Sequence, residues 1–253
     1  MAFEPSNPLE ESMLRASKDA AHRPQFYKDF LSAPIFVIQA GPVPEKAGMT
    51  KLEAGQTVSF PNMEKNGKSY IPIFTSLQEL RRALKSEAAY LSLNAREFLT
   101  LTKGADLLLN PMSELGKEFP KEEVAALLDG SMWQPESRIV VDKPQQVMIG
   151  QPKDYPTELV EALSRYFKKE SRVKRAYVAH YFNPATGEPP HTLVGIEASG
   201  DWDSVIGGIG VVAKGVMVPN PPIDFMPLTG DEGVQGYLKK LKPFYERKFL
   251  GLF

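Results

Sequence analysis

Short apolar runs alternate with polar, turn-rich stretches in the first half of the chain, and this pattern predicts strands. Four runs of three to five mainly apolar residues fit short, largely buried strands. They lie at 35–38, 70–74, 90–93 and 107–109. Asn66-Gly67 is a strong hairpin-turn signal just before the second run, and we expect residues 57–60 to form the partner strand of that hairpin.

Helix starts between these runs are marked by side chains that can accept a hydrogen bond from the backbone, or by proline. Asn7 before Pro8 marks the first helix, and Ser76 with Glu79 three residues later forms a capping box. Two further starts of the same kind occur at Asn94 and Pro120. The first half therefore mixes strands with short helices.

The second half contains a similar mixture with longer strands. A helix with an apolar face at 159–167 comes first. Strands are predicted at 176–182, 192–198 and 223–226, and helices near 203–213 and 231–241. Glycine and proline punctuate residues 129–144, which are the candidate linker. We therefore predict an α+β protein of two domains, each a small mixed sheet flanked by helices.

Several short segments spread over the chain carry a resemblance to a known family. They are Asn7-Pro8-Leu9-Glu10, Ile71-Pro72-Ile73-Phe74-Thr75-Ser76, Leu109-Asn110-Pro111, Ile149-Gly150-Gln151-Pro152 and Pro243-Phe244-Tyr245-Glu246-Arg247. In this order and spacing, the chain resembles the bacterial SseB family, the enhanced serine sensitivity proteins. The resemblance implies an SseB-like N-terminal domain over 1–135 and an SseB-like C-terminal domain over 144–253, both α+β. The family is named for a serine-sensitive growth phenotype, and it brings no catalytic residues to transfer.

Composition narrows the classes of function. The chain has 253 residues and a formal net charge of −1, which gives no overall attraction to nucleic acid or to an acidic membrane surface. It has no cysteine, which excludes disulfides, thiol catalysis and thiolate-bound metals. Charged residues from Glu4 to Asp19 leave no room for the apolar core of a signal peptide, and the most apolar stretch, 205–218, is too short to span a bilayer. We expect a cytoplasmic protein without membrane contact, and nucleic acid is not favoured as a partner.

Two motifs suggest cofactor or metal chemistry, and each has a structural alternative. Residues 208–213 fit the G-x-G-x-x-A string of dinucleotide sites, but Asp201 and Asp203 before them predict the cap of a helix already begun. We interpret these glycines as positions where that helix packs closely against a sheet. His180 and His191 flank a turn and approach each other if their strands pair, yet a structural zinc needs four ligands. Ordinary strand-end histidines are favoured, and we predict no metal and no cofactor.

A run of basic residues suggests a nucleic-acid or acidic partner. Residues 168–175 carry five basic side chains, which could contact RNA. The same run follows a predicted helix, where cations complement the negative end of the helix dipole. The helix-end interpretation is favoured, because no interleaved aromatic residues accompany the run.

The strongest candidate binding site combines the ends of two predicted strands. Phe74, Thr75 and Ser76 lie where a strand passes into a helix, and such a junction presents backbone N–H groups to an anion. Asn110 and Pro111 end another strand. If the two strands are neighbours, these residues line one cleft. The alternative is that Ser76 only caps its helix and Asn110 only shapes a turn.

These observations favour binding over catalysis. The chain lacks a phosphate loop and a nucleophile elbow. We interpret it as a non-enzymatic protein that binds an unidentified protein partner or a small metabolite. The alternative is an enzyme or sensor acting on an anionic or amino-acid metabolite, for which the strand-to-helix junction at Phe74 to Ser76 would be the site.

Overall fold

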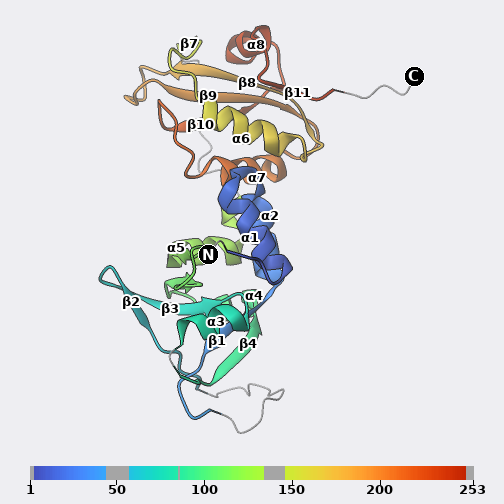
Figure 1. Cartoon of the computed structure of the whole chain (residues 1–253). Helices are drawn as coiled ribbons and strands as arrows, with labels where there is room; N and C mark the ends of the chain where they lie inside the picture. The colour runs from blue at the N-terminus through green and yellow to red at the C-terminus, as the bar shows by residue number, and fades with distance from the viewer. Residues whose placement is uncertain (1–2, 44–56, 85, 134–145, 249–253) are drawn as a thin grey trace, which may run out of the picture. The chain divides into compact units, whose positions relative to one another are not determined.

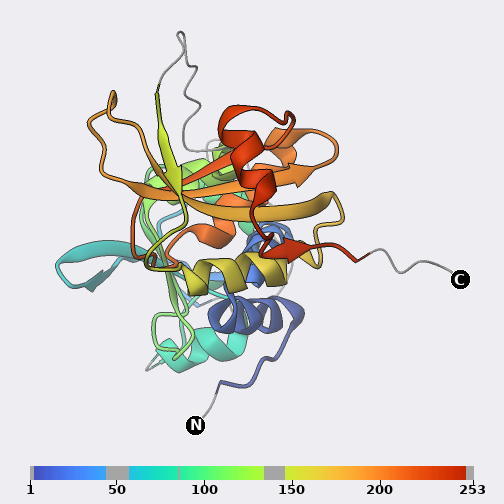
Figure 2. The same ribbon diagram turned by 90° about the horizontal axis from the view of Figure 1, so that it is seen from above.

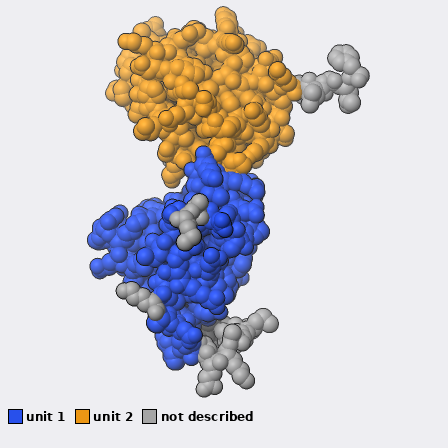
Figure 3. Space-filling model, in the orientation of Figure 1, with its two compact units in different colours: residues 1–18, 25–132 blue, residues 19–24, 133–253 orange. Residues whose placement is uncertain are grey.

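The computed structural model describes residues 3–43, 57–84, 86–133 and 146–248. The chain divides into two compact units, coloured separately in Figure 3. The first unit comprises residues 1–18 and 25–132, and the second comprises 19–24 and 133–253. Within the candidate linker, a helix ends at Asp129 and a 3-10 helix follows, whereas residues 134–144 lie outside the described residues.

A six-stranded mixed sheet forms the centre of the first unit (Figure 1). Its strands are β1 (Pro34–Ile38), β2 (Met63–Lys65), β3 (Lys68–Phe74), β4 (Tyr90–Asn94), β5 (Leu107–Leu109) and β6 (Lys117–Phe119). Their order is β4-β1-β3-β5-β6, and β2 pairs with β3. β3 and β5 are parallel, so their carboxyl ends lie at the same edge of the sheet. The helices are α1 (Pro8–Lys18), α2 (Arg23–Ser32), α3 (Leu77–Ala83), α4 (Ala95–Leu101), α5 (Lys121–Asp129) and the 3-10 helix η2 (Ser131–Trp133).

The register of this sheet aligns a fully buried face. Ile73 of β3 pairs with Leu109 of β5, and both side chains are fully buried. α2 covers this face, where the Phe30 ring stacks on the Phe119 ring with centroids 4.8 Å apart and planes 12° from parallel. Leu108 points to the opposite face and is also buried. β5 is therefore buried on both faces, as a continuous apolar run predicts.

A five-stranded mixed sheet forms the centre of the second unit. Its strands are β7 (Met148–Gly150), β8 (Val173–Phe182), β9 (His191–Ala198), β10 (Ile223–Pro227) and β11 (Tyr245–Glu246). Their order is β10-β9-β8-β11, and β7 also pairs with β8. The helices are η1 (Ala20–His22), α6 (Thr157–Phe167), α7 (Trp202–Ala213) and α8 (Gly233–Lys240).

Helices cover both faces of the second sheet (Figures 1 and 2). α6 and α7 pack on one face, over a core that includes Phe167 and Val194. α8 packs on the other face, over a smaller cluster that includes Leu193 and Leu238. Because Val194 and Leu193 are successive residues of β9, they point to opposite faces and supply one side chain to each cluster.

The carboxyl end of α6 is fixed by residues near the end of the described chain. Arg247 Nη2 donates to the carbonyl oxygens of Phe167 and Glu170, both at 2.6 Å. The Tyr245 hydroxyl donates to the same Phe167 carbonyl at 2.9 Å. The last carbonyls of a helix lack partners within the helix, so a cationic donor is favourable there. Tyr245 and Arg247 of the segment at 243–247 therefore bind the end of α6, and Tyr245 also belongs to the sheet through β11.

Residues 19–24 attach to the second unit by polar contacts. Asp19 accepts the Ala21 N–H, and its other carboxylate oxygen pairs with Arg165 Nε of α6 at 3.0 Å. Arg23 Nη1 donates to the carbonyl oxygen of Lys214, which follows α7. A short segment from the N-terminal part of the chain thus completes the helical layer of the second unit.

The α+β class is confirmed, but the predicted strand at 57–60 is wrong. Asn66 and Gly67 form the expected turn, with φ of 53° and 73°. The strand before this turn is Met63–Lys65, and Lys65 pairs directly with Lys68. A two-residue turn joins the residues on either side of it, so the partner strand ends at the turn itself.

The glycine string lies inside α7, which is capped by Asp201 and lacks the strand–turn–helix context of a dinucleotide site. A Cβ on Gly208 would lie 1.9 Å from the Tyr166 hydroxyl of α6. A Cβ on Gly207 would lie 1.9 Å from the carbonyl oxygen of Trp133. Close packing is therefore confirmed at Gly208, where the neighbour is α6, and not at Gly210, where nothing lies within 4 Å of a Cβ. The predicted packing against a sheet at these glycines is wrong.

We expect Gly207→Ala to lower the free energy of unfolding by about 1–3 kcal/mol, because the main chain of Trp133 cannot rotate away from the new methyl group. Gly210→Ala is the matched control on the same helix, since nothing lies within 4 Å of its Cβ. It is expected to stabilise the protein by about 0.5–1 kcal/mol. Chemical denaturation measures both changes, and equal effects would contradict this packing.

Candidate functional site

A buried carboxylate joins the start of α1 to the carboxyl ends of the parallel strands β3 and β5. Glu10 is 1% exposed, and its Oε1 accepts the Thr75 hydroxyl at 2.6 Å. Its Oε2 accepts the N–H and the hydroxyl of Ser6 at 2.7 and 2.8 Å. The Asn110 side chain accepts the Thr75 N–H at 3.0 Å and donates to Thr75 Oγ1 at 2.8 Å. We name Ser6, Glu10, Thr75 and Asn110 the strand-end cluster.

Local sequence explains how these groups come together. Asn7 caps α1 by accepting the Glu10 N–H at 3.0 Å, and its amide donates to the Thr75 carbonyl at 3.1 Å. Ser76 caps α3 by accepting the Glu79 N–H at 3.2 Å. Asn110 has a φ of 48°, a left-handed conformation that asparagine adopts more readily than most residues. Each strand end is thus turned sharply by a polar residue.

Hydrogen bonding decides the charge of the buried carboxylate. Burial by itself raises the pKa of Glu10, but hydrogen bonds from Thr75, Ser6 and Ser76 outweigh burial and hold the pKa below its usual value of 4.5. Glu10 is therefore an ionised carboxylate at neutral pH, and its charge is stabilised by the hydrogen bonds that it accepts.

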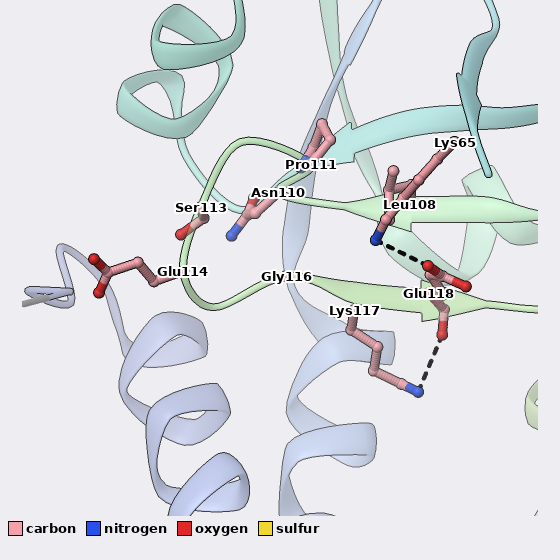
Figure 4. Close-up of a pocket in the computed structure, with 9 residues that line it drawn as sticks. All are labelled: Lys65, Leu108, Asn110, Pro111, Ser113, Glu114, Gly116, Lys117 and Glu118. Carbon is pink, nitrogen blue, oxygen red and sulfur yellow. Dashed lines mark hydrogen bonds and ion pairs between the residues drawn. The ribbon is translucent and has the colours of Figure 1, made fainter.

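An open groove of about 540 Å³ lies beside the strand-end cluster, along the loop that joins β5 to β6 (Figure 4). It is lined by Lys65, Leu108, Asn110, Pro111, Ser113, Glu114, Gly116, Lys117 and Glu118. The loop is tightly folded, because a Cβ on Gly116 would lie 3.0 Å from the Asn110 carbonyl oxygen. Asn110 belongs to both the groove and the cluster, so the cluster fixes one wall of the groove.

Charged side chains of both signs surround this groove. Lys65 Nζ pairs with Glu118 Oε1 at 2.9 Å, and the Tyr70 hydroxyl donates to Glu118 Oε2 at 3.0 Å. These two donors lower the pKa of Glu118. Lys117 Nζ pairs with Glu123 at 2.9 Å. Figure 4 shows the two lysines on opposite sides of Glu118. Lys65 contacts the Glu118 carboxylate, whereas Lys117 donates to the Glu118 main-chain carbonyl oxygen.

The structure separates the five residues predicted to line a cleft. The two strand ends are neighbours, as that prediction required. Asn110 and Pro111 line the groove. Thr75 belongs to the strand-end cluster, Ser76 caps α3, and Phe74 is fully buried. Thr75 and Asn110 are joined to each other by hydrogen bonds, so they support the groove wall.

Sequence reasoning alone misses Glu10 and the charged residues of the groove. The helix dipole accounts for an acid in the first turn, and it gives no reason to expect Glu10 to be buried. A signal exists in the spacing, since Ser6 lies four residues before Glu10 and can be reached by its side chain. Lys65 and Lys117 come from separate strands, and no local pattern connects them.

His180 and His191 lie on opposite faces of the second sheet, so the prediction that their rings approach each other is wrong. His191 pairs with Tyr181, and His180 pairs with Thr192. Paired residues share a face and successive residues alternate, which separates the two histidines. Within the described ranges, no three metal-ligating side chains come together.

Contacts within the second unit involve three of the five basic side chains at 168–175. Arg172 pairs with Glu170 at 2.7 Å, and Arg175 pairs with Glu246 at 2.7 Å. Lys169 Nζ lies 3.0 Å from His22 Nε2. These contacts give the basic run a role in the fold at the end of α6. In the part of the chain that the structure describes, no helix has the length and apolar character needed to cross a bilayer.

The fold and the site define a two-domain α+β protein whose first unit carries an open, charged groove braced by a buried carboxylate. The family profile of the SseB protein N-terminal domain matches residues 9–126, and that of the SseB protein C-terminal domain matches residues 141–247. The chain belongs to the SseB family.

Two curated relatives extend over almost the whole chain. Protein SseB of Escherichia coli (strain K12) and Protein SseB of Shigella flexneri are each 29% identical over 251 residues, which is 98% of this chain and 95% of theirs. No solved structure gives a significant match. The sequence similarity to these two relatives therefore extends over both units.

We expect Glu10→Gln to lower the free energy of unfolding at neutral pH by about 1–3 kcal/mol, because it weakens the acceptor for buried donors. The folded-state pKa of Glu10 is lowered, so its stabilisation is present above the usual carboxyl pKa and is lost as pH falls through the folded-state value. Urea denaturation across acidic pH should show this loss in the wild type and much less of it in the variant.

Glu11→Gln is the matched control, because Glu11 is the next residue of α1 and pairs with Arg15 at the surface. It should change the unfolding free energy by less than about 0.5 kcal/mol. Equal losses in the two variants would show that the strand-end cluster contributes no special stability.

Proposed function

We propose that this SseB-family protein is a non-enzymatic, cytoplasmic binding protein that takes a protein partner or a small ligand in the groove of its first unit. The observation that supports this is the position of the groove at the carboxyl end of β5, a strand that runs parallel to β3. In open sheets with parallel strands, ligands bind in the crevice outside the carboxyl ends of the strands. The strand-end cluster makes the wall rigid before a ligand arrives, which reduces the entropic cost of binding.

The ionisable groups of the site favour binding over proton transfer. A general acid or base works best with a pKa near the operating pH. The pKa values of Glu10 and Glu118 are both lowered by hydrogen bonds from neighbouring groups. Both oxygens of each carboxylate already accept hydrogen bonds or pair with a lysine. These acids are therefore held as charges and are poorly suited to exchange protons with a substrate.

The rim of the groove supports a protein partner with charged side chains. Lys65, Glu114 and Glu118 present both signs of charge within one open surface. Such a surface recognises a partner by matching charges, and it affects specificity and association rate more than raw affinity. We propose that the serine-sensitivity phenotype implied by the family acts through a partner bound here.

A second candidate function is a sensor or enzyme for an anionic or amino-acid metabolite. A free amino acid carries a carboxylate and an ammonium group, which complement Lys65 and Glu114 respectively. The same charged residues of the groove therefore support this alternative, and the two candidates differ in the size of the ligand.

Charge reversal on the rim tests the binding function. Immobilised full-length protein is expected to retain one stoichiometric partner from native lysate, and Lys65→Glu should reduce that retention by about tenfold or more. Lys103→Glu is the control, since Lys103 is an exposed lysine that does not line the groove. Circular dichroism checks that each variant is folded.

A thermal-shift panel of serine, other amino acids and inorganic phosphate separates the two candidates. A metabolite that binds the folded state raises the melting temperature, and the rise should disappear in Lys65→Glu. A partner or metabolite that binds Lys65→Glu as well as the wild type would refute the groove as the site.

A further inference from the structure

His191 of the second unit is buried, yet both nitrogens of its ring face oxygen acceptors. The residue is 1% exposed. Nδ1 lies 2.9 Å from the carbonyl oxygen of Pro189, and Nε2 lies 2.8 Å from Oδ2 of Asp224. A carbonyl and an ionised carboxylate can only accept hydrogen bonds, whereas a neutral imidazole has a single N–H to donate. Only the doubly protonated ring satisfies both contacts.

The surroundings of the ring agree with this geometry. Asp224 of β10 contacts the ring, and the charge of Glu188 in the preceding loop acts on it. Tyr181 of β8 packs edge-on, with ring centroids 5.4 Å apart. Burial alone lowers the pKa of His191. The Pro189 carbonyl and the charges of Asp224 and Glu188 outweigh burial, so the pKa is raised above its usual 6.5.

The ring stands at the end of an exposed loop, residues 183–190. Residues 184–190 are exposed, and the loop is anchored at each end by a buried polar residue. At the first end, Asn183 Oδ1 accepts the Ala185 N–H at 3.0 Å. At the second end, His191 links the Pro189 carbonyl to Asp224 of the edge strand β10. The His191 ring is therefore a bridge between the loop and β10.

We propose that His191 is a proton-operated latch, which holds the loop at 183–190 to β10 while the ring is doubly protonated and releases it when the ring loses a proton. After deprotonation, one of the two acceptors faces a nitrogen lone pair at hydrogen-bond distance. The Asp224 side chain is 45% exposed and can turn toward water, so breaking this bridge does not strand a buried charge. Loss of either contact breaks the side-chain bridge between the loop and β10, while the backbone pairing of β9 with β10 remains.

The direction of the pH effect follows from the raised pKa. A group whose pKa is higher in the folded state stabilises the fold fully below its unfolded-state pKa, and that contribution is lost as pH rises through the folded-state value. The latch is therefore closed at lower pH and opens toward higher pH. This device lies in the second unit and is independent of the groove.

Nuclear magnetic resonance on the full chain tests the latch directly. The nitrogen chemical shifts of the three histidine rings are followed from about pH 5 to about pH 9, and His191 is assigned from the signal missing in His191→Gln. We expect both ring nitrogens of His191 to be protonated at the start of the titration and its pKa to exceed 6.5. Protection of loop amides against hydrogen exchange should fall several-fold along the same titration curve.

Asp224→Asn provides the second variant, because Asp224 is partly exposed and its replacement is nearly isosteric. It should lower the pKa of His191 and shift the loss of loop protection to lower pH by the same amount. His180→Gln is the matched control, since His180 lies on the face of the sheet opposite to His191. It should change neither the His191 titration curve nor the pH dependence of loop protection. A His191 ring with one unprotonated nitrogen at about pH 5 would overturn the proposal. Loop protection that does not follow the His191 titration would overturn it equally.

Discussion

The hydrogen bonds from Thr75 and Ser6 to the buried Glu10 carboxylate are the constraint on which the first unit depends. They join three segments that are distant along the chain: the entry to α1, the end of β3 and, through Asn110, the end of β5. β5 ends at Leu109, and the Asn110 side chain that follows lies outside the paired residues of the strand. The strand-end cluster holds this side chain in place, and the loop that follows Asn110 forms the groove.

Much of the fold was predictable, because helix starts and buried strands depend on neighbouring residues. The caps at Asn7, Ser76 and Asn94 each accept a backbone N–H two or three residues ahead, a contact that local sequence specifies. β6 and β11 have three and two residues, too few for any periodicity. They are strands because a neighbouring strand offers them hydrogen-bonding groups, which is tertiary information. The partner strand of the hairpin was predicted at 57–60 from its apolar residues. Its actual position, 63–65, is set by the geometry of the two-residue turn.

The site was predictable in part, and the missing part is long-range. Two strand ends could be identified as a candidate pair, because an Asn-Pro and a Thr-Ser step each terminate an apolar run. The contact of Thr75 with Glu10 spans 65 positions, and no local sequence pattern predicts it. The segments that carry the family resemblance have structural roles here. Glu10 belongs to the strand-end cluster and Asn7 caps the helix that carries it, while Tyr245 and Arg247 bind the last carbonyls of α6. The residues that carry the family resemblance therefore stabilise the fold, and none of these contacts is catalytic in kind.

Glu10 in the first unit and His191 in the second are buried ionisable side chains at junctions of backbone segments, and they carry opposite charge. Glu10 is surrounded by donors and must be ionised, whereas His191 is surrounded by acceptors and must be protonated. Acid therefore weakens the first junction, and base weakens the second. Both junctions are intact only between the lowered pKa of Glu10 and the raised pKa of His191. Because the groove depends on the first junction and the loop at 183–190 on the second, the pH range in which both surfaces are ordered is set by two residues that no ligand need touch.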